Sequence, residues 1–358
     1  MEAVEKNFEN LSLSKPLEPK RLTEQNDPLH IIKTRLKTHG RPATISGPMV
    51  RYSKLAFRQL CHYYDTDIVY TPMILAREFV RNKYARISDF TTNKEDSPVI
   101  AQVGVNNTTD LLRVIEMICP FVDAIGVNCG CPIKEQVREG IGCALIYNED
   151  LMVDMVETVK SKYGNKLRME MKIRIHEHEK PERTLRLCER LCDAGVDWIT
   201  VHGRLKGTRS SQPVDLNAIK YIIDGLSGRN VPVVANGDCF TVADMARIQE
   251  FTGAHGVMSA RGLLNNPALF AGFDKCPWGC LERFLYYCID IGGLPIQLVL
   301  HHVYCMLENM QVLKRYLKQI MTLQSMVELL MWLENNFQFK RYGQSGFATG
   351  VEIPYKNE

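Results

Sequence analysis

Two cysteines, Cys129 and Cys131, lie one residue apart in the stretch Asn128-Cys129-Gly130-Cys131-Pro132. An apolar run from Ala124 ends directly before them, as a buried strand does where it meets a loop. Cysteines this close cannot form a normal disulfide, and a chain without a secretory signal keeps its thiols reduced. The pattern therefore favours a chemically active thiol in a loop. The alternative is that both cysteines are small buried hydrophobic residues.

The composition is that of a soluble globular protein with room for one large core and an accessory domain. Of 358 residues, 45% are hydrophobic and 24% are charged, and no apolar run is long enough to span a bilayer. The first residues include acids and lack an apolar segment, so we expect no secretory signal or transit peptide, and a location in the cytosol or nucleus. The net charge of +3 is too small to indicate a nucleic-acid-binding protein, so any such surface must be local. Twelve cysteines without a CxxC pair argue against a zinc site, and we expect no metal.

An apolar run rich in β-branched residues recurs eight times from about Thr44, and each run ends in Gly, Pro, Asn or a charged residue. A helix-length segment follows each run, which indicates parallel βαβ units, and eight such units close into a (β/α)₈ TIM barrel. An open doubly wound sheet would need a Gly-rich first turn, which we do not find after Val50. The runs are ATISGPMV, DIVYTPMI, VIAQVGV, DAIGVNCG, LRMEMKIRI, WITVHG, VPVVANG and GVMSARG.

The pattern divides the chain into four parts. Residues 41–273 form the predicted barrel, and residues 1–40 a predicted mobile tail that contains a short helix. Leucine, methionine and aromatic residues at helical spacing predict an all-helical domain over 274–342, followed by a C-terminal tail over 343–358. In the helical domain Lys314, Arg315 and Lys318 occur without a nearby acid, so this face either meets phosphates or is simply solvated.

In such a barrel the active site lies at the carboxyl ends of the strands. Each polar residue at a strand end also has a structural alternative: Lys172 could be a salt-bridge partner, His202 a core histidine and Gln102 a packing residue. Their joint occurrence carries the argument. The strand ends supply Pro48, Met49, Val50, Gln102, Asn128, Cys131, Lys172, Arg174, His202, Arg204, Asn236, Gly237, Asp238, Ala260 and Arg261.

The last two strand ends indicate a phosphate site. Glycines there, followed by a short helical segment, present backbone N–H groups to an anion, and Arg261 would add a charged hydrogen bond. The amide, lysine and histidine groups suit the edge of a planar hydrogen-bonding ring, and Pro48-Met49-Val50 would form an apolar floor beneath it. FMN meets all three requirements. Lys172 could instead form a Schiff base, as in aldolases, but Cys131 and Gln102 would then have no role.

These motifs resemble those of the tRNA-dihydrouridine synthases, flavoenzymes with a barrel and a C-terminal helical domain. The resemblance covers most of the chain after about Leu29. With YTPMILAREFVRN and the C-terminal GVEIPYK, it is strongest to the fourth eukaryotic subfamily in its fungal form. The matching motifs are GPMVRYSKLAFRQL, VNCGCP with GIGCALI, MKIRIH, TVHGR, VANGD and GVMSARGLLNNPALF.

The resemblance implies reduction of the C5–C6 double bond of uridine at positions 20a and 20b of the tRNA D-loop, with NADPH or NADH as electron donor. Reduced FMN would pass hydride to C6, and Cys131 would be the general acid that protonates C5. Asn128 would contact the target base, with Arg174 and Arg204 beside it as further substrate-binding residues. The residues assigned to FMN are Pro48, Met49, Val50, Gln102, Lys172, His202, Asn236, Gly237, Asp238, Ala260 and Arg261.

The target uridine must leave its stack, so phosphate contacts elsewhere must hold the RNA. We expect these contacts from two clusters, Arg204 with Lys206 and Arg209, and Lys314 with Arg315 and Lys318. We also expect a monomer.

Two other functions stay open. A reductase or dehydrogenase of a free pyrimidine, similar to dihydroorotate dehydrogenase, would not need the helical domain. A flavin-free tRNA folding helper would need neither Cys131 nor the FMN residues.

Overall fold

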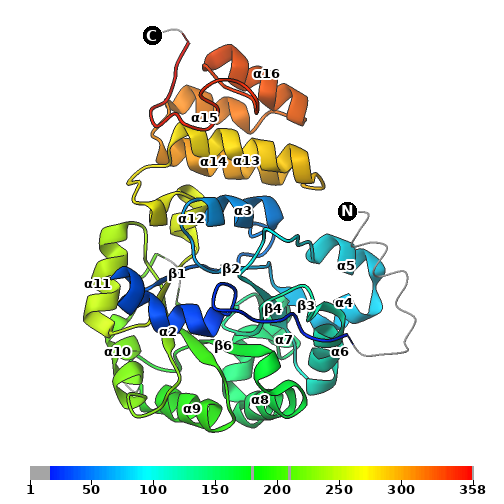
Figure 1. Cartoon of the computed structure of the whole chain (residues 1–358), viewed down its shortest axis with the longest axis vertical. Helices are drawn as coiled ribbons and strands as arrows, with labels where there is room; N and C mark the ends of the chain where they lie inside the picture. Colours follow the sequence, from blue (N-terminus) through cyan, green and yellow to red (C-terminus); the bar gives the residue numbers. More distant parts are fainter. Residues whose placement is uncertain (1–16, 179–180, 209–210, 357–358) are drawn as a thin grey trace.

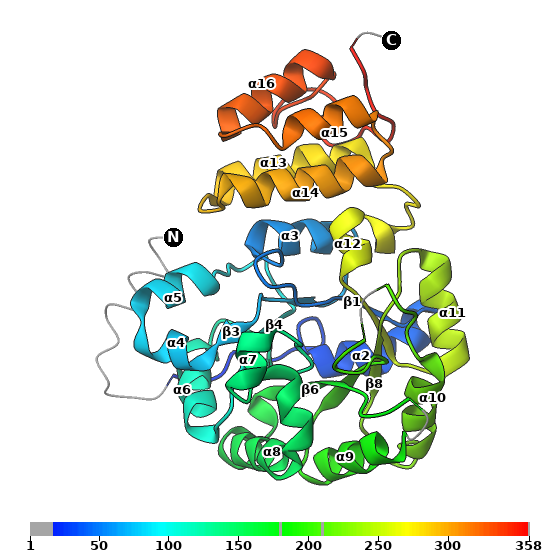
Figure 2. The same cartoon turned by 180° about the vertical axis from the view of Figure 1, so that it is seen from behind.

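A closed parallel barrel carries a stack of helices on one side in the computed structural model, which describes residues 17–178, 181–208 and 211–356 (Figures 1 and 2). The strands are hydrogen-bonded in the order β1-β9-β8-β7-β6-β5-β4-β2, and a parallel bridge from Ile45 to Ile68 joins the two ends. The predicted TIM barrel is therefore confirmed. The strands are β1 (Ala43–Ser46), β2 (Val69–Tyr70), β3 (Ile74–Leu75), β4 (Val99–Gly104), β5 (Ala124–Cys129), β6 (Arg168–Arg174), β7 (Trp198–His202), β8 (Val233–Asn236) and β9 (Gly256–Ser259).

The second predicted run forms two short strands, β2 and β3, which both pair with β4. Pro72 lies between them, and because proline has no backbone N–H it cannot continue the ladder. The chain bends there and then enters α4 (Ala76–Arg81) and α5 (Lys83–Asp89). This insertion brings α5 to the rim of the barrel on the side of the C-terminal helices (Figure 2).

Helices between the strands form the outer layer. The predicted caps are present: Asn107 accepts a hydrogen bond from Asp110 N, and Thr241 with Asp244 forms a capping box. The buried face of the helix after Asn107 carries Leu111 and Ile115 against the strands. These helices are α3 (Leu55–Tyr63), α6 (Thr108–Ile118), α7 (Lys134–Arg138), α8 (Glu149–Tyr163), α9 (Glu182–Asp193), α10 (Leu216–Gly225) and α11 (Val242–Thr252), and α12 (Arg261–Asn265) follows the last strand.

The N-terminal helix α2 (Pro28–His39) closes the amino ends of the strands, and the predicted short helix is thereby confirmed. Its Ile31 and Ile32 pack with residues of the barrel interior such as Ile45 and Val234. Before it, Lys20 pairs with Asp123 at 2.8 Å. The first sixteen residues of the predicted tail lie outside the described residues.

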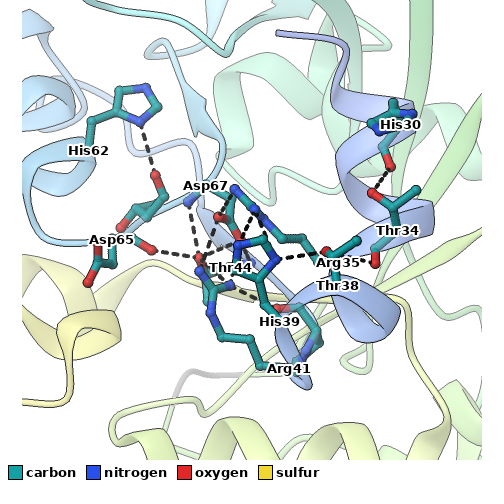
Figure 3. A network of polar contacts seen from close by, with 12 residues as sticks. His30, Thr34, Arg35, Thr38, His39, Arg41, Thr44, His62, Asp65 and Asp67 are labelled. Carbon is teal, nitrogen blue, oxygen red and sulfur yellow. Dashed lines mark hydrogen bonds and ion pairs between the residues drawn. The ribbon is translucent and has the colours of Figure 1, made fainter. Parts of the chain in front are cut away.

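A polar network around Asp67 lies at this closed end of the barrel (Figure 3). Asp67 pairs with Arg35 of α2 at 2.7 Å and with Arg41 at 2.6 Å, and it accepts a hydrogen bond from Thr44 N at 2.9 Å. Two other acids that directly precede strands do the same for their neighbours. Asp123 accepts from Val99 N at 2.8 Å and Asp197 from Met169 N at 2.7 Å. These carboxylates therefore bind the first residues of adjacent strands together.

The C-terminal helices are α13 (Trp278–Ile291), α14 (Ile296–Asn309), α15 (Lys314–Ile320) and α16 (Met326–Asn336), and they rest on α3 and α12 (Figures 1 and 2). The segment after Gly343 has no helix, but it folds back onto α13. Gly350 O accepts from Gly279 N at 2.8 Å, and the carboxylate of Glu282 accepts from Lys340 N and Ala348 N. Among the described helices, none is long and apolar enough to cross a membrane.

Candidate active site

A cavity of about 240 Å³ opens at the carboxyl ends of the strands. Its wall includes every residue predicted from the strand ends except Met49, whose side chain packs against the core. The cavity has further lining residues that sequence analysis did not identify. One is Phe240, whose ring centroid lies 5.1 Å from the guanidinium carbon of Arg261. The predicted residues in the wall are Pro48, Val50, Gln102, Asn128, Cys131, Lys172, Arg174, His202, Arg204, Asn236, Gly237, Asp238, Ala260 and Arg261.

The loop after β5 is held by Asn128. Its Oδ1 accepts hydrogen bonds from Gly130 N at 3.0 Å and Cys131 N at 2.8 Å, and its Nδ2 donates to Gln102 Oε1 at 2.7 Å. The amide predicted to contact a target base thus also fixes the backbone of Cys131. Sequence reasoning missed this second role, which is typical of an Asn that caps a turn.

The two thiols of this loop have different surroundings. Cys129 is fully buried, and its sulfur lies 4.0 Å from the sulfur of Met171 in the core. Cys131 is half-buried and lines the cavity. Burial raises the pKa of the Cys131 thiol, although a backbone hydrogen bond from Ile133 and the positive charges of Arg174 and Lys172 act in the opposite direction. Cys131 is therefore protonated near neutral pH and exposed to a ligand.

Arg174 links two loops at the rim. Its Nε donates to Gly130 O at 2.7 Å, and its Nη1 donates to Leu205 O at 2.7 Å. The side chain thus braces the loop of Cys131 from the side, while its charge stays near the thiol.

On the adjoining part of the wall, where Lys172 is the register partner of Asn128, the side chains of Lys172 and Asn236 meet. Lys172 Nζ donates to Asn236 Oδ1 at 2.7 Å, and Asn236 Nδ2 donates to Met258 O at 3.2 Å. Gln102 Nε2 is buried and makes no hydrogen bond. A buried amide N–H group without a partner costs free energy, so a ligand acceptor in the cavity would stabilise it.

His202 is a neutral residue of the same wall. Burial and the nearby charges of Lys172, Arg174 and Arg204 lower its pKa to about 2. Its Nε2 accepts a hydrogen bond from Arg204 Nη1 at 3.1 Å, which leaves the proton on Nδ1.

The ends of β8 and β9 are held by a carboxylate between two guanidinium groups. Asp238 pairs with Arg204 at 2.6 Å and with Arg261 at 2.8 Å. Gly237 has a φ of 139°, and a Cβ there would lie 2.6 Å from the Val214 side chain. The helix that follows Ala260, α12, has only five residues, so backbone N–H groups and Arg261 must supply most of the attraction for an anion.

A second and larger hollow, the interdomain groove, lies beside the cavity and shares Val50 with it. Its volume is about 860 Å³, and it runs between the barrel rim and the C-terminal helices. Sequence reasoning missed this groove, although the run Arg51-Tyr52-Ser53-Lys54 directly after the first strand end was a signal for it. The polar and aromatic residues that line it include Arg51, Tyr52, Lys54, Tyr84, Gln297 and His301.

The two predicted RNA-binding clusters differ in how exposed their side chains are. Arg204 is 2% exposed and its guanidinium also donates to Gln212 O, so it belongs to the cavity wall. Lys206 is exposed, and Arg209 lies outside the described residues. Lys314, Arg315 and Lys318 are exposed on α15. In the described parts of the chain no group of three or more His, Cys, Asp or Glu side chains could hold a metal ion.

The comparisons with known proteins agree with this geometry. A family model described as dihydrouridine synthase (Dus) matches residues 44–357. A Saccharomyces cerevisiae protein named tRNA-dihydrouridine(20a/20b) synthase (NAD(P)+) is 65% identical over 94% of this chain and 92% of its own length. A Schizosaccharomyces pombe protein of the same name is 41% identical over 91% of this chain and 96% of its own length. A human protein named as similar to that enzyme is 41% identical over 75% of this chain and 83% of its own length. This chain therefore belongs to the dihydrouridine synthase family.

Proposed function

We propose that this protein is an FMN-dependent tRNA-dihydrouridine synthase that uses NAD(P)H to reduce uridine at positions 20a and 20b. In the net reaction NAD(P)H loses a hydride, and the uracil ring gains a hydride at C6 and a proton at C5. The observation that carries the proposal is a protonated, half-buried thiol, Cys131, at a cavity walled by hydrogen-bond donors. The names of the fungal relatives support the choice of substrate and of its two positions.

The residues present fit a flavin. The buried Nε2 of Gln102 needs an acceptor, and Lys172 and Asn236 present further polar groups to the same space. Pro48 and Val50 add apolar surface, and Arg261 with the backbone after Gly237 would hold the phosphate. When bound, FMN would pass the hydride of NAD(P)H to the substrate.

Cys131 would donate the proton. Burial keeps its thiol protonated at neutral pH, as an acid must be before the reaction. After transfer the sulfur carries a negative charge, which the neighbouring Arg174 and Lys172 stabilise. Asn128 and Arg174 hold the loop, so that the thiol keeps its orientation in both states.

The interdomain groove would receive the RNA around the target nucleotide. A uridine in a folded tRNA must be turned out of its stack, which costs a few kcal/mol. Aromatic rings at the groove, such as Tyr52, Tyr84 and His301, can stack on bases, and Arg51 can meet a phosphate. Because the groove adjoins the cavity at Val50, a nucleotide held in the groove lies next to Cys131's cavity.

A spectroscopic experiment tests the proposal. The purified protein should show a flavin absorption band, which NADPH bleaches without air and unmodified tRNA restores. A band restored by a free pyrimidine instead would support the small-molecule reductase. A colourless protein that still binds tRNA would support the folding helper.

A further inference from the structure

A layer of polar residues lies inside the barrel below the active-site cavity. The strand register aligns Gln102 of β4 with Gly126 of β5, Gly126 with Glu170 of β6, and Glu170 with Trp198 of β7. Residues two apart on a strand point to the same face, so Glu170, Lys172 and Arg174 rise in that order along one side of the interior. Lys172 and Arg174 reach the cavity, and Glu170 lies one layer beneath them.

Glu170 is buried, and no cation of the described chain forms an ion pair with it. The residue is 0% exposed, and neither carboxylate oxygen makes a hydrogen bond of normal geometry. Tyr70, Trp198 and Thr200 lie close enough for their polar groups to lower its pKa, but burial has the larger effect and raises the pKa above its ordinary value. A buried carboxylate without a cation lowers the stability of the fold. If Glu170 had only a structural role, an apolar residue in its place would make the protein more stable.

Other buried carboxylates of the described chain are satisfied. Asp96 pairs with Arg58 at 2.6 Å, and Asp197 pairs with Lys160 at 2.8 Å. Glu282 accepts two backbone hydrogen bonds and a third from the indole of Trp278. Glu170 differs from these carboxylates because the groups around it are the neutral side chains of Tyr70, Thr200 and Trp198, with neither a paired cation nor a bonded backbone N–H.

Gly126 makes room for this carboxylate. A Cβ at position 126 would lie 2.5 Å from Glu170 Oε2, closer than real atoms approach. Any other residue at this position of β5 would displace the carboxyl group. The space for Glu170 is therefore built into the neighbouring strand.

The charge next along the strand is that of Lys172. Burial lowers the pKa of Lys172, and the negative charge of Glu170 is the largest influence that raises it. The two described side chains form no ion pair within the usual distance, because the ammonium group donates to Asn236. The carboxylate acts across the interior instead, where a low dielectric strengthens electrostatic interactions.

We propose that Glu170 is a positioning residue that acts through Lys172. From one layer below the cavity, its negative charge keeps Lys172 protonated, so that a charged donor faces the flavin ring. This inference rests on the proposed function, because it assumes that FMN occupies the cavity. The titratable groups around Lys172 are Glu170 and Arg174 on its own strand, Cys129 and Cys131 of β5 and its loop, Tyr70 of β2 and His202 of β7.

The expected effect is on FMN binding and its pH dependence. Lys172 is protonated below its pKa, and the affinity that depends on its charge is lost as the pH rises through that value. Glu170→Gln removes the negative charge, so this loss should occur about one pH unit lower than in the wild type. Near pH 8 the variant should bind FMN about tenfold more weakly, because a charged donor makes a stronger hydrogen bond than a neutral amine.

A double-mutant cycle separates this role from a structural one. The wild type, Glu170→Gln, Lys172→Met and the double variant are stripped of flavin, and FMN is titrated between pH 6 and 10 by fluorescence quenching. If Glu170 acts through Lys172, Glu170→Gln shifts the pH profile in the wild type and leaves it unchanged in the Lys172→Met background. Asp123→Asn, at another buried carboxylate that lies at the amino ends of the strands and pairs with Lys20, is the matched control and should not shift the profile.

Three results would overturn the inference. The profile of Glu170→Gln could coincide with that of the wild type, or Glu170→Gln could weaken FMN binding equally in both backgrounds. A wild type that binds no FMN at any pH would overturn the proposed function as well, so the two failures are distinguishable. Should Glu170→Gln not fold, Glu170→Met replaces it, because an apolar side chain of similar size removes the same negative charge and should lower the pH of FMN loss in the same way.

Discussion

The two ends of the barrel use polar residues in opposite ways. At the amino ends of the strands, each of three carboxylates binds both a cation and a backbone N–H of the adjacent, preceding strand; they are Asp67, Asp123 and Asp197. At the carboxyl ends, the Nε2 of Gln102 has no partner, and Cys131 presents a half-buried thiol to a cavity.

This difference separates stability from chemistry. The carboxylates at the closed end already have their hydrogen-bond and ion-pair partners, so they do not bind a ligand. They hold α2 and the strands in place. Groups at the open end are held by their neighbours but keep a donor or a proton free for binding, which costs stability. Variants at the closed end should therefore change unfolding, and variants at the open end should change binding and turnover.

The largest expected effect is at the thiol. Cys131→Ala should slow dihydrouridine formation about 10²–10⁴-fold, because the proton donor is lost, while FMN binding and unfolding stay near wild type. Turnover with unmodified tRNA and a thermal unfolding curve measure the two quantities. Cys129→Ala is the matched control: it should destabilise by about 1 kcal/mol through lost packing and keep its turnover. Equal loss of turnover in both variants would contradict the separation.

A variant at the closed end should show the reverse pattern. Asp67→Ala leaves Arg35 and Arg41 without their carboxylate and should destabilise the protein by about 3 kcal/mol in urea unfolding. Turnover by the folded fraction should stay unchanged. A normal unfolding midpoint together with lost turnover would mean that this end takes part in the reaction.

Exposed basic residues at the two ends of the molecule should also differ in their effect on RNA binding. Replacing Lys314, Arg315 and Lys318 by Gln should make the slope of log affinity against log salt shallower by about 2. Each phosphate contact that is lost reduces the number of counterions that binding releases. Lys37 is exposed at the closed end, and Lys37→Gln should leave the slope unchanged. The measurement is tRNA binding at several salt concentrations. An unchanged slope for the triple variant would remove α15 from the RNA-binding surface.

The smallest effect is the acid response of Asp67. Burial alone would raise the pKa of Asp67, but hydrogen bonds from Arg41 and Thr44 outweigh it and lower the pKa. A carboxylate with a lowered pKa contributes its full stability above about pH 3.9, the ordinary Asp value, and loses it as the pH falls through the folded-state pKa. The stability difference between the wild type and Asp67→Ala should therefore shrink on acidification below pH 4. A difference that does not change would contradict this pairing.

The strands and the active-site residues could be predicted because both have local signals. A buried run that stops at Gly, Asn or Cys marks a strand end, and eight such runs define the barrel. Sequence also favoured Cys131, and the structure distinguishes it from Cys129 by the cavity that only the former lines. The roles assigned to individual residues toward FMN and tRNA, the domain limits, the monomer and the cellular location stay predictions.

What sequence could not show depends on pairs far apart in the chain. Nothing near Arg204 announces that its guanidinium is buried on Asp238, and nothing near Asp67 announces Arg35. The interdomain groove exists only because α5 and the loop after α13 meet across about two hundred residues. Such contacts follow from tertiary packing, for which a local pattern has no signal.

The most direct measurement of the central claim is the product itself. Unmodified tRNA is incubated with NADPH and either the wild type or Cys131→Ala, and dihydrouridine is located in the tRNA by mass spectrometry. We predict dihydrouridine at positions 20a and 20b with the wild type and almost none with Cys131→Ala after the same time. Equal amounts of product from both proteins would contradict the assignment of Cys131 as the proton donor, and no product from either would contradict the proposed function.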